Sequence, residues 1–315
     1  MKRRTRTIVP LAALAWLVAL GGVLAAARQD AAPGGVYARL DAKQREALAV
    51  FLRVGGTADF KPDGTTELVL YGTANRDDLL PRLADMPFVN EVTFKNLLAT
   101  DAGLKHLAKL PNLRSVTVRE TLFVGDPVLK RLCELKGLEA IQIGPYFDVH
   151  VTDAGLAHLG RLPKLRSLRL QGAAEITDAG AARLKDLVGL RELYLDDSAL
   201  TDAGLAQLKT LKELEELGLH RTKITDTGVA GLGGLARLRK LDLSMTALDG
   251  TGLSGLRGMT ALRELNISNT RVTDTGLTHL RALAALRKLN LKGTKVTRAG
   301  VEPLRRALPR LNIVR

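Results

Sequence analysis

Residues 190–285 read LRELYLDDSALTDAGLAQLKTLKE (190–213), LEELGLHRTKITDTGVAGLGGLAR (214–237), LRKLDLSMTALDGTGLSGLRGMTA (238–261) and LRELNISNTRVTDTGLTHLRALAA (262–285). One 24-residue pattern occurs four times in succession, with aliphatic residues in fixed positions. A fixed period of this length is typical of a solenoid, in which each unit buries its apolar face only against its neighbours. These four units therefore decide the fold.

Each unit contains two different hydrophobic periods. Leu193 and Leu195 alternate with polar residues, which predicts a short strand with both leucines on one face. Leu205 and Leu208 follow at helical spacing, and Leu211 closes the turn. The sequence thus predicts an α/β solenoid with one strand and one helical segment in every repeat.

The array extends in both directions from these four units. Strand starts are predicted near Thr65, Val89, Leu113, Leu138, Leu165, Leu190, Leu214, Leu238, Leu262 and Leu286, with a last partial strand from Leu311. Residues 65–315 are therefore expected to form one continuous domain of ten repeats plus a final strand. The uncapped last strand would leave an exposed sheet edge, which either carries arginines as protection or pairs with another chain.

The residues before the array divide into two parts. Residues 1–30 combine a basic start, MKRRTR, with an uncharged stretch from Ile8 to Ala27, which predicts a cleaved signal peptide or an uncleaved membrane anchor. Both alternatives place the repeats outside the cytoplasm, in the periplasm, at the cell surface or in the medium. Residues 31–64 are interpreted as a linker and N-terminal cap, with a helix from Leu40 to Val54 that begins at Asp41.

Composition limits the kind of core and the kind of partner. Hydrophobic residues make up 46% of the chain and aromatic residues only 3%, so the core must be aliphatic. The formal net charge is +14. The single cysteine, Cys133, excludes an internal disulfide and is predicted to be a small buried hydrophobic residue.

The dipeptide Thr-Asp recurs before a glycine and an apolar residue at Thr152-Asp153, Thr177-Asp178, Thr201-Asp202, Thr225-Asp226 and Thr273-Asp274. This T-D-x-G-L signature resembles the ribonuclease-inhibitor-like class of leucine-rich repeats, and it is shared by F-box-associated repeats and bacterial internalin-like surface proteins. The resemblance implies a right-handed horseshoe with a parallel sheet on its concave face and helices on its convex face. It also implies recognition of a protein on the concave face.

Two details of the resemblance can be tested. Thr201 or Asp202 has the chemistry of a helix N-cap and a first-turn acid. Thr222, Thr246, Thr270 and Thr294 occupy the place where many members of the family carry stacked asparagines, and their hydroxyls are expected to form a similar ladder. The F-box alternative is set aside, because residues 31–64 leave no room for that module.

Catalytic, metal and cofactor sites are not predicted. The sequence contains no G-x-S-x-G, H-E-x-x-H or phosphate-loop motif. His106, His158 and His279 share one helical position, and they lie at least two repeats apart, too far from one another to share a metal. The expected function is non-enzymatic.

The residues that alternate with the strand leucines are expected to face outward on the sheet. The predicted partner-binding residues on this face are Glu192, Tyr194, Asp196, Glu216, His220, Asp242 and Glu264. Together they suggest an acidic surface around one aromatic anchor, suited to a basic or amine-bearing protein partner. An ordinary solvated sheet face is the alternative.

Two other surfaces compete with this one. The long repeat near residue 146 predicts an overhanging loop in which Tyr146 and Phe147 form a binding tip, or in which Phe147 fills a packing gap. Arg166, Arg191, Arg239, Arg263 and Arg287 recur after the first leucine of their repeats. Such a rim would suit an anionic polymer or a membrane surface, whereas the low aromatic content argues against single-stranded nucleic acid.

Overall fold

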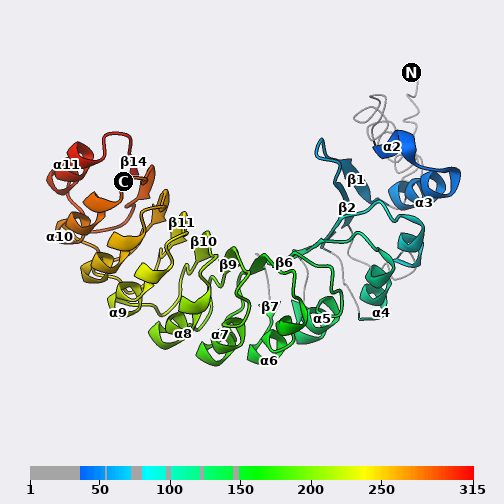
Figure 1. Cartoon of the computed structure of the whole chain (residues 1–315), viewed down its shortest axis with the longest axis horizontal. Helices are drawn as coiled ribbons and strands as arrows, with labels where there is room; N and C mark the ends of the chain where they lie inside the picture. The colour runs from blue at the N-terminus through cyan, green and yellow to red at the C-terminus, as the bar shows by residue number, and fades with distance from the viewer. Residues whose placement is uncertain (1–35, 54, 72–79, 97–100, 121–123, 145–148) are drawn as a thin grey trace, which may run out of the picture. The chain divides into compact units, whose positions relative to one another are not determined.

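The computed structural model of the chain describes residues 36–53, 55–71, 80–96, 101–120, 124–144 and 149–315 (Figure 1). The predicted targeting segment 1–30 and the predicted loop tip Tyr146-Phe147 lie outside the described residues. The chain divides into two compact units, residues 1–118 and 119–315, and each is taken by itself below. Within the described part, no helix is both long and apolar enough to cross a membrane.

The first unit begins with helices packed beside an antiparallel strand pair. Its elements are α2 (Val36–Arg39), α3 (Ala42–Arg53), β1 (Thr57–Phe60), β2 (Thr66–Tyr71), η1 (Leu80–Asp85), β3 (Glu91–Lys95), α4 (Asp101–Leu104), η2 (Lys105–Lys109) and β4 (Ser115–Arg119). Asp41 caps α3 as predicted: its carboxylate accepts the Gln44 N–H, and the Gln44 side chain accepts the Asp41 N–H. Strand β1 pairs with β2 antiparallel, and β3 joins β2 in parallel.

The second unit repeats a strand and a helical segment. Its elements are β5 (Val124–Gly125), α5 (Asp126–Leu132), β6 (Ala140–Ile143), β7 (Val149–His150), α6 (Asp153–Leu156), η3 (Leu159–Arg161), β8 (Ser167–Leu170), α7 (Asp178–Leu184), β9 (Glu192–Tyr194), α8 (Asp202–Gln207), η4 (Leu208–Thr210), β10 (Glu216–Gly218), α9 (Asp226–Ala230), η5 (Leu232–Gly234), β11 (Lys240–Asp242), η6 (Thr251–Gly258), β12 (Glu264–Asn266), α10 (Asp274–Leu277), η7 (Thr278–Ala282), β13 (Lys288–Asn290), α11 (Arg298–Ala307) and β14 (Asn312–Val314).

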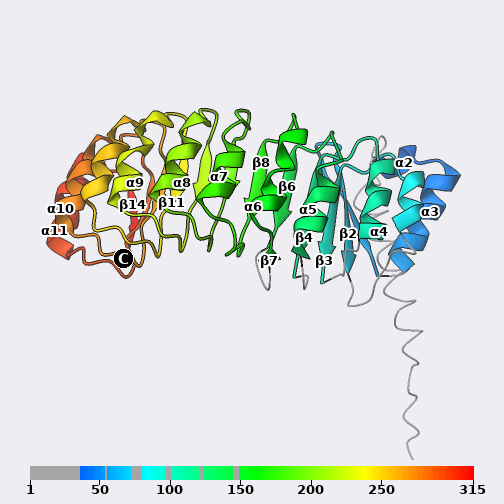
Figure 2. The ribbon, with the colours of Figure 1, turned by 90° about the horizontal axis from the view of Figure 1, so that it is seen from below.

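The strands of the main sheet in this unit are parallel. Their order in the sheet follows the sequence: β6, β8, β9, β10, β11, β12, β13 and β14. Leu193 pairs with Leu217, and Leu217 with Leu241, so equivalent leucines stand side by side. The strands lie along one face of the unit and the helical segments along the other (Figures 1 and 2). Leu193 and Leu195 are both fully buried. The predicted α/β repeat architecture is confirmed.

The Thr-Asp signature connects each repeat to the next one. Thr201 caps α8, where its hydroxyl oxygen accepts the Ala203 N–H. The Thr201 N–H and hydroxyl also donate to the two oxygens of Asp178, at 2.8 and 2.6 Å. The same pair of bonds joins Thr152 to Asp126, Thr177 to Asp153, Thr225 to Asp202 and Thr297 to Asp274. The aspartate therefore stabilises the following repeat rather than its own helix alone.

The glycine of the signature makes room for this aspartate. A Cβ on Gly204 would lie 2.3 Å from the Asp178 Oδ1, and one on Gly228 would lie 2.3 Å from the Asp202 Oδ1. A side chain at either position would clash with the carboxylate that holds the repeat interface. Thr, Asp and Gly thus form one unit of packing.

The series is interrupted at residues 249–250, where Asp-Gly replaces Thr-Asp. Asp226 still accepts three backbone N–H groups, from Asp249, Gly250 and Gly252. Gly250 occupies the aspartate position of its repeat and has no carboxylate to accept hydrogen bonds from Thr273 in the following repeat. The Thr273 side chain also makes no capping hydrogen bond in its own repeat. The segment that follows Gly250 is the 3₁₀ helix η6 instead of an α-helix.

The predicted threonine ladder is wrong. The hydroxyls of Thr222, Thr246, Thr270 and Thr294 each donate to the carbonyl three residues earlier, on Leu219, Leu243, Ile267 and Leu291. A hydroxyl reaches only a carbonyl within its own turn, so these side chains close turns inside a repeat. The side-chain ladder between repeats is the Thr-Asp series on the helical side.

A left-handed residue follows each strand from β3 to β13 except β5 and β7, which pair only with each other. The residues with positive φ at this position are Asn96, Glu120, Gly144, Gly172, Asp197, Arg221, Met245, Asn269 and Gly293. Their backbone turns the chain away from the sheet while the N–H still bonds the next repeat, as when Met245 donates to Ser268 at 2.9 Å. Glycine adopts this conformation without strain and asparagine with little, whereas Met245 adopts it at a cost in free energy.

Replacing Met245 with glycine is expected to raise the free energy of unfolding by about 0.5 kcal/mol. The left-handed conformation costs an L-residue about 1 kcal/mol or more, and the half-exposed methionine side chain (44% exposed) returns only part of this. Ala247→Gly, two residues on and without a positive φ, is the control and is expected to lower stability. Urea denaturation followed by circular dichroism measures both, and a loss of stability in Met245→Gly would contradict the prediction.

Candidate functional site

The predicted site residues lie on the sheet face of the second unit and fall into three groups. Glu192, Tyr194 and Glu216 form one cluster, Asp196, His220 and Asp242 belong to a second, and Glu264 stands apart beside Lys288 at 3.6 Å. The neighbouring strands bring equivalent positions together, so that Tyr194 faces Gly218 in exact register. Each group also contains residues that were not among the binding residues predicted from the sequence.

Arg169 is the centre of the first cluster. Its guanidinium donates to the Glu192 carboxylate at 2.7 and 3.2 Å and lies 3.5 Å from a Glu216 oxygen. It also sits above the Tyr194 ring, 4.3 Å from the ring centroid, and Lys240 approaches the same ring at 5.7 Å. The Tyr194 hydroxyl donates to Glu216 at 2.5 Å. Two cations therefore balance the two glutamates.

Tyr194 is not an exposed anchor, and this corrects the prediction from sequence. Only 7% of the residue is exposed. The reason lies in the next strand: a Cβ on Gly218 would come within 2.2 Å of the Tyr194 ring, so the ring occupies the space that the glycine leaves empty. The ring has a structural role between Gly218 and Arg169, and little of the residue is available to a partner.

Electrostatics follow from this packing. Burial opposes ionisation of Glu192, but the hydrogen bonds from Arg169 and Ser167 outweigh it and hold the pKa of Glu192 below its ordinary value. Burial, together with the hydrogen bond to Glu216, raises the pKa of the Tyr194 hydroxyl far above its usual range. Glu192 and Arg169 therefore form a charged pair at neutral pH, beside a neutral Tyr194 hydroxyl.

The second cluster is a chain of hydrogen bonds across five strands. Asp196 accepts hydrogen bonds from the Gln171 side chain and from the backbone N–H of His220. The ring Nδ1 of His220 lies 2.8 Å from the Ser244 hydroxyl, which in turn donates to Asp242. Asn266 extends the chain by donating to Asp242 at 2.9 Å. Asp196 is only 7% exposed, and burial raises its pKa above the ordinary value. The prediction that Asp196 offers an open carboxylate is therefore wrong.

Ser244, His220 and Asp242 do not have the arrangement of a catalytic triad. The Ser244 proton is directed to Asp242 rather than to the histidine, and the serine oxygen already accepts from Asn266 at 3.2 Å. Ser244 is also only 3% exposed. Its hydroxyl is part of the fold and has no free path to a substrate.

The described residues also contain no cluster of His, Cys, Asp or Glu with the grouping of a metal site.

Several arginines of the predicted rim already bind carboxylates or backbone carbonyls of the same chain. Arg239 lies 2.9 Å from Glu215, and Arg191 lies 3.9 Å from the same residue. Arg166 donates to the Gly189 carbonyl at 2.8 Å, and Arg287 donates to two carbonyls of its own turn. Local partners therefore reduce the rim's capacity for an external polyanion.

Cys133 is buried as predicted, and burial raises the pKa of its thiol to about 12.

Replacing Arg169 with methionine is expected to lower the free energy of unfolding by about 1–2 kcal/mol at pH 7, because two half-buried carboxylates lose their main cation. The pKa of Glu192 is lowered in the folded protein, so its contribution exists above its unfolded pKa of about 4.3 and is lost as the pH falls. The difference between variant and wild type should therefore shrink at pH 3. Equal differences in urea midpoint at both pH values would show that Arg169 acts by packing alone.

Comparisons with known proteins agree with this architecture. A family model described as leucine-rich repeat matches residues 258–283. An internalin of Listeria monocytogenes (inlF) is 19% identical, with a TM-score of 0.58, over 78% of this chain and 72% of the internalin. A second Listeria monocytogenes internalin, internalin C2, is 21% identical, with a TM-score of 0.50, over 69% of this chain and 84% of its own. The sequence matches no protein of curated function. With its period, its parallel sheet and these likenesses, the chain has the leucine-rich repeat fold.

Proposed function

We propose that the chain is a non-enzymatic scaffold that binds a protein partner through the sheet face of residues 119–315. The observation that carries the proposal is the ordered polar surface from β8 to β13. Its inner atoms are fixed by the two hydrogen-bonded clusters, while the side chains of Lys240, Glu264 and Lys288 remain 43%, 46% and 59% exposed. A surface that is already ordered loses little entropy on binding.

The chemistry of the exposed groups favours a partner of mixed charge. Glu192 and Glu216 are balanced by Arg169 and Lys240, so the face is not the acidic surface that the carboxylates alone suggest. Lys288 adds a positive group beside Glu264. Alternating charges of this kind confer specificity and orientation more than affinity.

A charge swap tests the proposal. Glu264→Lys combined with Lys288→Glu keeps the ion pair and the net charge but inverts the pattern that a partner meets. The matched control swaps Lys43 and Asp85, an ion pair of 2.7 Å in the first unit. Residues 31–315 would be used to capture partners from an envelope extract, followed by cross-linking. The swap on the sheet face should abolish capture of a partner that the control retains, and equal capture by both would refute the proposal.

The proposed location is outside the cytoplasm. It rests on the basic and uncharged pattern of residues 1–30, and the fold likeness to internalins is compatible with it. A reporter enzyme active only after export, fused behind residue 35, tests this location. Activity that persists after deletion of residues 1–30 would contradict it.

A second candidate function is binding of an anionic polymer. Residues 221–315 contain 18 lysines and arginines against six aspartates and glutamates, whereas residues 119–220 contain 13 against 16. Lys223, Arg271, Lys292 and Lys295 are exposed on this basic part. Binding to heparin as a probe should fall steeply between 50 and about 300 mM salt, because the interaction depends on screened charges. Binding that is insensitive to salt would exclude this candidate.

A further inference from the structure

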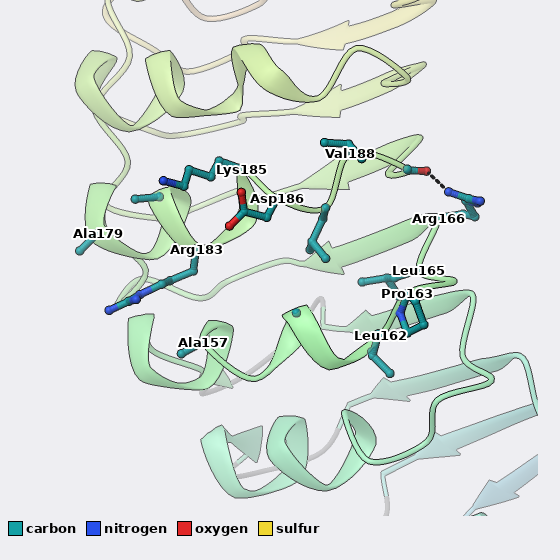
Figure 3. A pocket seen from close by; sticks show the side chains of 14 residues that line it. Ala157, Leu162, Pro163, Leu165, Arg166, Ala179, Arg183, Lys185, Asp186 and Val188 are labelled. Carbon is teal, nitrogen blue, oxygen red and sulfur yellow. Dashed lines mark hydrogen bonds between the residues drawn. The ribbon is translucent and has the colours of Figure 1, made fainter.

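The helical face of the second unit contains a cleft between two neighbouring repeats. It has a volume of about 790 Å³. Its apolar lining comes from Leu162, Pro163, Leu165, Leu187 and Val188, and its charged rim from Arg166, Arg183, Lys185 and Asp186. In Figure 3, Leu162, Pro163 and Leu165 come from the segment around η3, and Arg183, Lys185 and Asp186 from the end of α7 and the turn after it. The cleft lies on the opposite side of the repeats from the proposed sheet-face site.

Two glycines explain why the cleft exists at this repeat. Gly160 follows the second helix leucine, a position that holds Lys185, Lys209, Arg257 or Arg281 in four other repeats and Gly233 in a fifth. A Cβ at Gly160 would meet no atom within 4 Å, so the missing side chain leaves open space. Gly189 lies on the other side, where a Cβ would fall on the Arg166 guanidinium that binds its carbonyl at 2.8 Å.

The lining of the cleft is unusual for a helical face. Val188 is 59% exposed, in a position that the next repeat fills with Lys212. Beside it, Arg166 uses one N–H on Gly189 and keeps further donors for another acceptor. An exposed aliphatic residue is thus combined with a rim of three cations and one anion.

We propose that this cleft binds a short peptide segment of a protein partner that presents an aliphatic side chain next to acidic ones. The aliphatic side chain would cover Val188 and Pro163, the exposed apolar residues of the lining, and the carboxylates would face Arg166, Arg183 and Lys185. Small-molecule sites enclose most of their ligand, whereas nine of the fourteen residues that line this cleft are exposed. An occupant that stays attached to a larger partner fits such an open cleft better. The proposal is independent of the sheet-face site.

Three labelled peptides of equal length test the chemistry. In the first, a central leucine is flanked by aspartates and glutamates; in the second, the same leucine is flanked by lysines; in the third, the leucine of the first is replaced by glycine. Fluorescence polarisation with residues 31–315 should detect binding of the first peptide. The second should not bind, and the third should bind about tenfold or more weakly, because it cannot bury the leucine side chain.

Variants of the protein locate the site. Gly160→Gln places a neutral side chain in the cleft at a position where a Cβ meets no atom within 4 Å, so the fold should be unaffected while the affinity for the first peptide falls at least about tenfold. Lys185→Glu should weaken binding similarly. Lys209→Glu, the same change in the same position of the next repeat, lies outside the cleft and should bind as the wild type does.

Each outcome decides the proposal. Loss of binding in Gly160→Gln and Lys185→Glu, but not in Lys209→Glu, supports it. Equal binding of the leucine and glycine peptides, equal loss in both lysine variants, or full binding by Gly160→Gln would overturn it. The sheet-face charge swap of Glu264 and Lys288 should leave peptide binding intact, which separates failure here from failure of the proposed function.

Discussion

Replacing Asp202 with alanine is expected to lower the free energy of unfolding by about 2–3 kcal/mol. Asp202 accepts the Thr225 N–H at 2.8 Å and the Thr225 hydroxyl at 2.5 Å, and both are bonds to a charged acceptor between two repeats. The substitution leaves both donors without this partner at a repeat interface. Because a solenoid derives its stability from such interfaces, the loss should appear in the global transition. Urea denaturation measures it, and Asp186→Ala, at an exposed position, is the control, with an effect within about 0.5 kcal/mol.

A double-mutant cycle makes the test specific for the packing unit of Thr, Asp and Gly. Gly228→Ala alone should also destabilise the protein, because its Cβ would meet the Asp202 carboxylate at 2.3 Å. Once Asp202 is alanine, that clash no longer exists, so the second substitution should cost at least about 1 kcal/mol less than it does in the wild type. Additive losses would show that Gly228 is needed for another reason, such as the nearby Leu205 side chain.

The repeat architecture is predictable from sequence because its signal is local and redundant. Leu193, Leu217, Leu241 and Leu265 occupy equivalent positions, and each is buried by the same neighbours in the next repeat. The role of the Thr-Asp dipeptide is only half predictable. Thr201 could be assigned as a helix cap from its own repeat, but the Asp178 bond comes from the repeat before it. Only the register of neighbouring repeats reveals that contact.

The candidate site is harder to predict for the same reason. Alternation correctly assigns Glu192, Tyr194 and Glu216 to one face of the sheet, yet it does not say how far each is covered. The missing information is what stands one repeat away: Arg169 on one side of Tyr194 and Gly218 on the other. Both residues are visible in the aligned columns, and a glycine beside an aromatic residue in parallel register is the signal that was available.

The cleft beside α7 was not predicted for a different reason. Pattern analysis looks for residues that are present, and the cleft follows from side chains that are absent at Gly160 and Gly189. Each glycine taken alone reads as an ordinary variation of a surface position. Their combination becomes meaningful only when α7 is seen beside the preceding turn, with Val188 exposed between them (Figure 3).

Replacing Tyr194 with alanine is expected to cost about 3 kcal/mol of stability, contrary to what an exposed binding residue would show. The substitution removes the ring of a residue that is only 7% exposed and that packs against Gly218 and Arg169, and the glycine cannot fill the space. Tyr194→Phe keeps the ring and removes only the hydrogen bond to Glu216, so it should cost about 1–2 kcal/mol. Thermal and urea denaturation of both variants give the two values.

The order of these two losses separates the possible roles of the tyrosine. If packing over Gly218 is its main contribution, alanine must be clearly worse than phenylalanine, and Gly218→Ala should destabilise the wild type more than it destabilises Tyr194→Ala. If both tyrosine variants were as stable as the wild type but failed to capture a partner, Tyr194 would be a contact residue after all. The sheet face would then have to open around Arg169 on binding, because the ring is covered before a partner arrives.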